Sequence, residues 1–201
     1  MLHFLTKDNI IKPMKMALSF DQKVFFNENG YLQLEGVLDP EKVEIVKNLA
    51  PAGSRDLFRA SEQMRKSVLP RNLVDLVLEL GVSRPLRFGL DQLISSGMFS
   101  KGGSLEKLFC LQGIEVGIFY PLEEGPEESF FPTRPGDVLL VKGERHLPVH
   151  TIESKMMLAV LVRSTSVYIR NLRDPHAHAL KELGYAYGDK LKDQFHPVVC
   201  R

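Results

Sequence analysis

Hydrophobic positions in the first hundred residues mostly recur every three or four residues, which is the spacing of an amphipathic helix. Several such segments begin at a capping residue and end at a glycine or a proline, as helices commonly do. Helices are predicted from Ser19 to Asn29, from Pro40 to Ala50 and from Asn72 to Leu80. A short strand is predicted at 31–34, and residues 54–99 as a whole are predicted to be mixed and helical.

Beyond residue 105 the pattern becomes that of β-strands. The predicted strands are residues 114–120, 137–141, 156–163 and 167–169. The run at 156–162 is apolar without interruption, which indicates a strand buried on both faces. Asp174 as N-cap, Pro175 at the first helical position and Gly184 at the end predict a closing helix.

These patterns predict an α+β protein of one domain, residues 1–201. We expect residues 1–104 to form a mainly helical N-terminal part, packed on a barrel-like core. Residues 105–201 should supply the main β-core and the C-terminal helix. The length of 201 residues fits one domain, and 44% apolar with 25% charged residues is normal for a globular chain.

The charge balance excludes some classes of partner. Lys and Arg number 26 against 25 Asp and Glu, so the net charge is only +1 and gives no overall field to hold nucleic acid. The basic residues between 54 and 99 are interleaved with acids, as on a solvated helical face. No apolar run approaches the roughly 20 residues of a membrane helix. We therefore expect neither a nucleic-acid nor a membrane partner.

The N-terminus and the cysteines predict a cytoplasmic location. Lys7, Asp8 and Lys12 interrupt the apolar run that a secretory signal peptide needs. Cys110 and Cys200 have no metal-site spacing and are expected to be reduced thiols. Cys110 lies in an apolar phrase, so we expect an inert buried thiol and not a nucleophile.

Two phrases of the chain resemble one enzyme family. The opening FFNENGYLQLEGVLDPEKVEIV and the later PGDVLLVKGERH are similar to the phytanoyl-CoA-dioxygenase branch of the non-heme Fe(II)/2-oxoglutarate-dependent oxygenases. The closing DPHAHALKELGYAYGDKLKDQFHP resembles a small group of uncharacterised bacterial proteins related to that branch, with a chlamydial member described as a divalent-cation-dependent regulator. The resemblance implies a double-stranded β-helix (a jelly roll, cupin-like), with the N-terminal helices and a C-terminal helix packed outside.

The same resemblance implies an iron site of two histidines and one carboxylate, and here the sequence departs from the family. His146 stands at the family's second iron histidine. The first ligands come as His-x-Asp or His-x-Glu, and none of the six histidines has an acid two residues later. No histidine lies between His3 and His146, where residues 104–119 should hold the motif. We therefore predict a degenerate metal site with His146 as a vestigial ligand, no catalytic residue and no cofactor.

Three further residues are candidate ligand-binding positions. His150 lies four residues after His146, and only a tight turn at Pro148 would bring both rings to one ion. By the resemblance, Lys155 or Arg163 could match the family's basic residue for 2-oxoglutarate, and equal parity would put both on one strand face. His176 and His178 would fall in a first helical turn and not face each other.

The leading hypothesis is an oxygenase-derived fold with a repurposed pocket for a small ligand, such as an organic acid, or for a protein partner. One alternative is an active Fe(II)/2-oxoglutarate oxygenase with an atypical site that includes His146, and only then are Fe(II) and 2-oxoglutarate expected. A second alternative, a metal-dependent DNA-binding repressor, is disfavoured by the near-zero net charge and the scattered cysteines.

Overall fold

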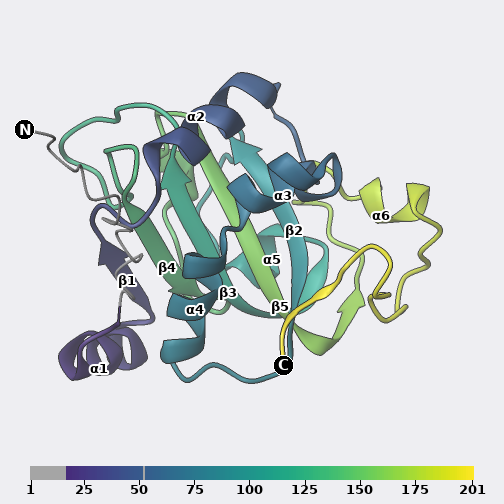
Figure 1. Cartoon of the computed structure of the whole chain (residues 1–201). Coiled ribbons are helices and arrows are strands. Elements are labelled where there is room, and N and C mark those ends of the chain that lie inside the picture. Colours follow the sequence, from purple (N-terminus) through teal and green to yellow (C-terminus); the bar gives the residue numbers. More distant parts are fainter. Residues whose placement is uncertain (1–16, 52) are drawn as a thin grey trace, which may run out of the picture.

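The computed structural model describes residues 17–51 and 53–201. The predictions that concern the N-terminal residues, including His3, lie outside this part. In this part of the chain, six strands form one curled antiparallel sheet, with most of the helices on one side (Figure 1). The strand order is β1-β4-β3-β5-β2-β6. The bounds are β1 (Tyr31–Leu34), β2 (Leu86–Ile94), β3 (Leu111–Pro121), β4 (Val138–Lys142), β5 (Met156–Tyr168) and β6 (Val198–Cys200).

The predicted helix boundaries are largely confirmed. The α-helices are α1 (Phe20–Asn29), α2 (Pro40–Leu49), α3 (Glu62–Val68), α4 (Arg71–Glu79), α5 (Leu105–Leu108) and α6 (Ala179–Glu182), and the 3-10 turns are η1 (Leu57–Arg59) and η2 (Val149–Thr151). Ser19 forms the predicted capping box with Gln22, and Gly30 ends α1 with a φ of 74°. Asp39 caps α2, whose first residue is Pro40.

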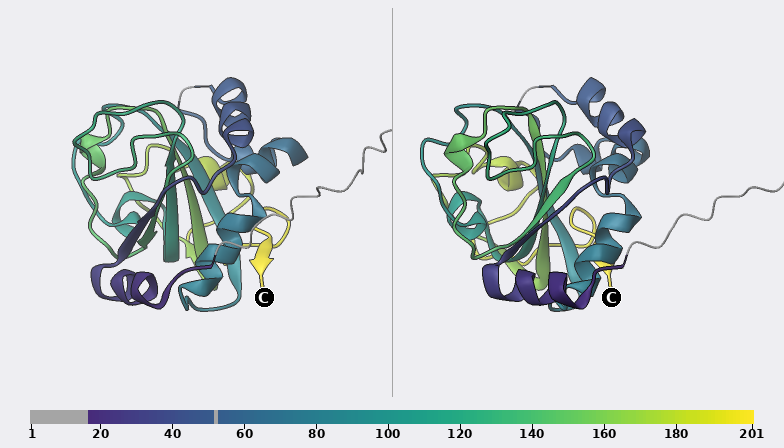
Figure 2. Two further views of the ribbon diagram at one scale, coloured as in Figure 1. Left: turned by 60° about the vertical axis from the view of Figure 1, so that its left-hand side comes forward. Right: turned by 90° about the vertical axis from the view of Figure 1, so that its left-hand side faces the viewer.

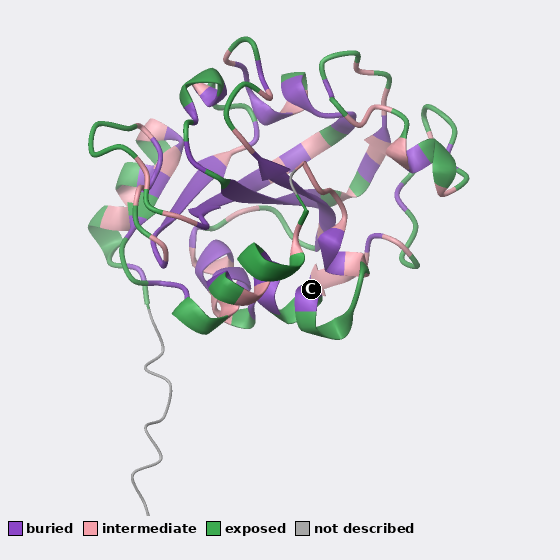
Figure 3. Ribbon diagram, turned by 90° about the horizontal axis from the view of Figure 1, so that it is seen from above, coloured by how far each residue is buried: buried purple, intermediate pink, exposed green. Residues whose placement is uncertain are grey.

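Apolar side chains cover both faces of the sheet, which explains the uninterrupted apolar run of β5. Met157, Ala159 and Leu161 pack against helices α1–α4 on one face. Leu158, Val160 and their neighbours pack on the other face against loops, α5 and α6. Figure 2 shows the helices on one side of the strands and long loops on the other, and Figure 3 shows that the strands between these layers are almost wholly buried.

Three sequence-based assignments need correction. Residues 86–94, placed in a helical region, form strand β2, which pairs with β5 and β6 near the sheet edge. The two strands predicted at 156–163 and 167–169 are mainly one long strand, β5. The helix predicted from Pro175 is only the four-residue α6, because residues 175–178 form turns, although Asp174 does accept the backbone N–H of His176.

The sheet therefore unites segments from both halves of the chain. The predicted β-core strands 114–120, 137–141 and 156–163 do lie in one sheet, together with β1 and β2 from the N-terminal part. Among the described residues, no helix is long and apolar enough to cross a membrane.

Candidate functional site

His146 follows β4 and lies beside a short strand pairing. Gly103 and Leu147 exchange two backbone hydrogen bonds, of 3.0 and 2.9 Å. The pairing brings Gly102 so close to His146 that a Cβ on Gly102 would lie 2.8 Å from the imidazole Cε1 and 2.6 Å from the Leu147 carbonyl oxygen. Only glycine fits there. Residues 101–103, which look like a flexible linker in the sequence, are thus the segment opposite His146.

The other sequence candidates are not brought to His146 by any described contact. His150 lies exposed in η2, and the backbone N–H of Lys155 donates to Glu123 at 2.9 Å just before β5. Arg163 has the same parity in β5 as Met157, Ala159 and Leu161, whose side chains lie on the helix-covered face of the sheet.

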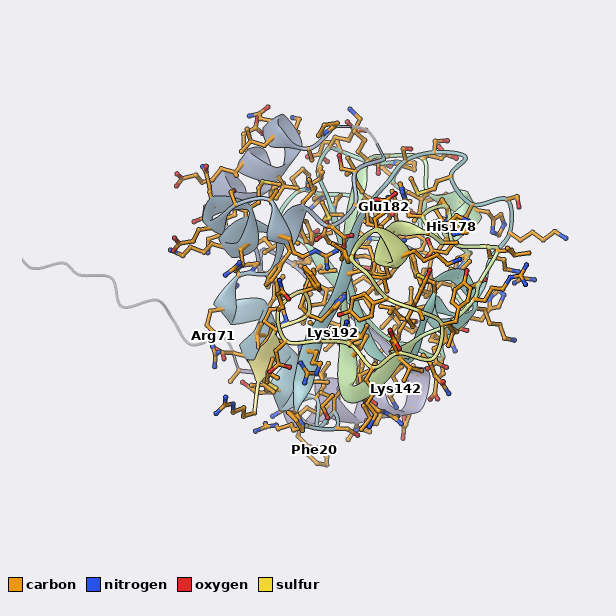
Figure 4. The ribbon with its side chains drawn as sticks, turned by 90° about the vertical axis from the view of Figure 1, so that its right-hand side faces the viewer. Phe20, Arg71, Lys142, His178, Glu182 and Lys192 are labelled. Carbon is orange, nitrogen blue, oxygen red and sulfur yellow. The ribbon has the colours of Figure 1, made fainter. Side chains whose placement is uncertain are left out.

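Arg163 is ion-paired with Glu115 and lines a cavity of about 400 Å³. The cavity is also lined by Lys142, whose position at the lower edge of the sheet is visible in Figure 4. Glu106 and Glu144 line it as well. Three glutamates against two cations make this cavity a poor site for an anion.

A smaller pocket lies beside the segment that faces His146. Its volume is about 280 Å³, and Lys101 and Arg173 are its charged residues. The remaining lining residues are mostly apolar and include Phe99, Leu108 and the exposed Leu172. None of the described lining residues is acidic. Lys101 adjoins Gly102, so this basic pocket begins one residue from the His146 contact.

A buried ion pair joins the first and last parts of the chain close to this pocket. The Arg55 guanidinium lies 2.5 Å from the Asp174 carboxylate, with side-chain exposures of 4% and 0%. Asp174 also accepts the backbone N–H groups of Cys110 and His176, each at 2.9 Å. Burial opposes ionisation of Asp174, but Arg55 and these hydrogen bonds outweigh burial and lower its pKa.

The cysteine beside this pair is a buried thiol with a raised pKa. Cys110 is fully buried, and its sulfur lies 3.7 Å from the Arg55 guanidinium. Burial, with the nearby Asp174, raises the pKa of the thiol to about 12. The predicted burial of this thiol is confirmed. A thiol with a raised pKa carries almost no thiolate near neutral pH, which supports the prediction that it is inert.

Two buried groups on or next to β2 have opposite pKa shifts. Asp91 accepts the backbone N–H groups of Leu57 and Phe58, yet burial raises its pKa to about 7. His196 meets the Gly89 carbonyl at 2.8 Å through Nδ1, while Nε2 has no partner among the described residues. Burial, assisted by Arg59, lowers its pKa to about 4. His196 is therefore neutral near neutral pH, whereas Asp91 is about half protonated there.

Comparison with known proteins identifies the fold. No protein-family model and no curated protein matches the chain. Among solved structures, the non-heme α-ketoglutarate-dependent epimerase SnoN from nogalamycin biosynthesis matches over 90% of this chain and 95% of its own, at 17% identity and a TM-score of 0.65. CytC3 with Fe(II) and α-ketoglutarate matches over 89% and 86%, at 14% identity and 0.57. CT296 from Chlamydia trachomatis matches over 75% and 99%, at 16% identity and 0.51. The chain shares the fold of these proteins.

This finding corrects the cofactor prediction. The sequence analysis expected no cofactor, because the His-x-Asp/Glu motif is missing. Among the solved structures that share the fold, SnoN is a non-heme α-ketoglutarate-dependent epimerase that has been solved with Fe3+ and α-ketoglutarate (2-oxoglutarate). CytC3 has been solved with Fe(II) and α-ketoglutarate. The expectation of no cofactor is therefore contradicted, because proteins of this fold bind iron and 2-oxoglutarate.

The described residues do not fit a conventional iron centre. Within residues 17–51 and 53–201, no group of three His, Cys, Asp or Glu side chains could hold a metal ion. The segment beside His146 offers Lys101 and two glycines, which supply neither an imidazole nor a carboxylate. The sheet face away from the helices is lined by residues such as Leu90, Phe119 and Leu158.

Sequence reasoning missed the residues that the fold brings together around Arg55. The spacing of the basic residues between 54 and 99 suggested a solvated face, but Arg55 is buried and meets an acid 119 positions away. Lys101 and Arg173 were also missed, because they line one pocket although they lie far apart in the sequence. The sequence singled out Asp174, but only as the N-cap of a closing helix and not as the partner of Arg55.

Proposed function

We propose that this chain is a small-organic-acid-binding protein on the double-stranded β-helix fold of the Fe(II)/2-oxoglutarate-dependent oxygenases, and that the acid binds in the Lys101–Arg173 pocket. The observation that carries the proposal is a pocket with two cations, no acid and apolar walls, one residue from the His146 contact. A guanidinium and an ammonium can hold a carboxylate by charge-assisted hydrogen bonds. The apolar walls of Phe99 and Leu108 suit the carbon chain of a small acid.

The surroundings of the pocket support an anion. Asp174, the acid nearest to Arg173 in the sequence, is fully buried and neutralised by Arg55. Its charge therefore does not compete for Arg173. Asn171 holds the neighbouring backbone by donating to the carbonyls of Lys107 and Phe109, at 3.1 and 2.8 Å. This loop is thus tied to the segment before β3, which fixes one wall of the pocket.

The test is calorimetric titration of the purified protein with 2-oxoglutarate and with succinate at low ionic strength. Lys101→Gln and Arg173→Gln should each weaken binding about tenfold or more, as loss of a charged hydrogen bond does. Lys155→Gln and Arg163→Gln are matched controls, since they remove the two basic candidates that the sequence indicated. Loss of binding in the controls alone would move the site to those residues and refute this proposal.

A second candidate function is an Fe(II)/2-oxoglutarate-dependent oxygenase with an atypical site that includes His146. The fold favours it, because the solved structures similar to this chain include such enzymes. Anaerobic titration with Fe(II), followed by a succinate-release assay, tests it directly. Tight iron binding and turnover that both disappear in His146→Ala, but not in His150→Ala, would establish the oxygenase and demote the binding protein.

The cytoplasm remains our proposed location. It is supported by the two cysteines, both free and buried, which show no sign of an oxidising compartment. We keep a protein partner as an open part of the proposal.

A further inference from the structure

A second, independent groove lies on the helix-covered side of the molecule. It has a volume of about 480 Å³ and lies between α2, α3, α4, η1 and the C-terminal strand β6. Its floor is apolar and consists of Phe58, Leu69, Pro70, Val74 and Val199. Phe58 is held in place by stacking on Phe88, with ring centroids 3.9 Å apart and an interplanar angle of 13°. The floor is therefore a fixed surface and not a set of loose side chains.

The rim of this groove is entirely cationic. Lys42, Arg65, Lys66 and Arg71 line it, and none of the described lining residues is acidic. Figure 4 shows Arg71 on α4, close to the C-terminal strand. A ring of positive charge around an apolar floor favours a ligand that carries a negative head on an apolar body.

Two of the four cations are available to such a head. Lys66 pairs with Glu62 at 2.6 Å and Arg71 with Asp75 at 3.0 Å, both one helical turn away on exposed surface. Within the described chain neither Lys42 nor Arg65 is ion-paired with a carboxylate. The Arg65 guanidinium lies 5.4 Å from the centroid of the Phe58 ring. It therefore stands where the apolar floor meets the charged rim.

We infer that this groove binds an amphipathic carboxylate, with an aliphatic chain on the Phe58–Val74–Val199 floor and the carboxylate at Arg65 and Lys42. The planar guanidinium of Arg65 can grip a carboxylate through two parallel hydrogen bonds. The volume lies within the range of about 300–1,000 Å³ that is usual for small-molecule sites. This inference does not rest on the Lys101–Arg173 pocket, since the two sites share no lining residue.

Charge and chain length distinguish this ligand from its simpler relatives. An uncharged alcohol with the same chain would occupy the floor but would leave Arg65 and Lys42 unmatched. A two-carbon acid would satisfy the cations but would bury almost no apolar surface, and burial of apolar area is the main favourable term. Both halves of the ligand are therefore required for strong binding.

The experiment is titration of the full chain with decanoate, below its micelle range, followed by calorimetry and by NMR shifts. Decanol and acetate are the probes that lack one half of the ligand. We expect decanoate to bind at least tenfold more tightly than either. Arg65→Gln should weaken decanoate binding about tenfold or more and leave decanol unchanged. Val199→Glu, at the partly exposed edge strand, should abolish binding by placing a like charge in the groove.

Several controls make the result decisive. Far-UV circular dichroism and the melting temperature identify a variant that fails to fold. Arg65→Gln changes an exposed residue and remains informative if Val199→Glu does not fold. Lys155→Gln, a lysine that lines neither this groove nor the proposed organic-acid pocket, should leave decanoate binding unchanged. Loss of decanoate binding only in Lys101→Gln with Arg173→Gln would place decanoate in the organic-acid pocket and also overturn the inference. Equal affinity for decanol and decanoate, or decanoate binding unaffected by Arg65→Gln in the folded protein, would overturn the inference.

Discussion

Two arginine–carboxylate pairs of this protein have the same chemistry and opposite surroundings. Arg55 and Asp174 are 4% and 0% exposed and lie 119 residues apart in the sequence. Arg163 and Glu115 join neighbouring strands, and their side chains are 58% and 11% exposed, so the guanidinium lies in solvent. The first pair fastens the segment after α2 to the C-terminal part of the chain. The second pair sits at the rim of a cavity and can exchange its partner for water.

The difference shows why charge spacing in a sequence is a weak guide to importance. Arg163 is easily noticed because it follows an apolar strand at the distance that the family resemblance requires. Arg55 has no such context in the sequence. Its guanidinium is nevertheless the buried one, so loss of its counter-ion would strongly destabilise the fold. A buried charge is held by all its partners together, and Asp174 accepts from Cys110 and His176 as well as from Arg55.

The largest effect is expected at the buried pair. Arg55→Met leaves the Asp174 carboxylate charged and buried without its counter-ion, so the free energy of unfolding should fall by about 3–5 kcal/mol. Asp174→Asn should cost a similar amount, because Arg55 then loses its partner. Urea unfolding followed by circular dichroism measures both.

The double variant sharpens this prediction. Arg55→Met with Asp174→Asn removes both charges, so its loss of stability should be clearly smaller than the sum of the two single losses. A loss below about 1 kcal/mol in Arg55→Met would show that water reaches the pair, and the contrast with Arg163 would disappear.

The local fold was predictable where a few neighbouring residues decide it. Ser19 with Gln22 and Asp39 with Pro40 set helix starts that the structure confirms. Strand β2 was not predictable in the same way. Its sequence, LRFGLDQLI, places Arg87 and Asp91 among apolar residues, and the pattern looks helical. These residues form a strand because β5 offers a pairing partner some 70 residues later.

Of the candidate site, only the position of His146 has a local signal, the GD-strand phrase before it, and the structure places His146 four residues after the end of β4. Its role as a vestigial ligand stays a prediction. The segment that faces it, Lys101-Gly102-Gly103, gives no local signal, because glycines there look like a linker. Their role comes from backbone pairing with Leu147, a contact 44 positions away that no short pattern encodes.

Buried groups without an ion pair should give the next largest effect, seen as a pH dependence. The Asp91 pKa is raised from 3.8 to about 7, so its contribution to stability is complete below pH 3.8 and is lost as pH rises to 7, by about 4 kcal/mol. The His196 pKa is lowered from 6.5 to about 4, so its contribution is complete above pH 6.5 and is lost as pH falls to 4, by about 3 kcal/mol.

These opposite slopes should nearly cancel in the natural protein between pH 4 and 6.5. His196→Gln removes one slope, so the stability of that variant should fall as pH rises through this window. Asp91→Asn removes the other, so its stability should rise instead. Urea unfolding at half-unit steps of pH checks both. Parallel curves for the two variants would show that neither group titrates as its burial requires.

The smallest effect is expected at the exposed pair. Arg163→Gln should change the free energy of unfolding by about 0–1 kcal/mol, because an ion pair whose guanidinium lies in solvent gains little and restricts two side chains. Glu115 raises the pKa of Arg163, so the two charges do interact, but salt weakens such an interaction. The small difference from the natural protein should therefore shrink further in 1 M salt, whereas the loss in Arg55→Met should persist there. A salt-resistant loss of more than about 2 kcal/mol in Arg163→Gln would mean that this guanidinium is also part of the protein's interior, and exposure would no longer explain the contrast between the two pairs.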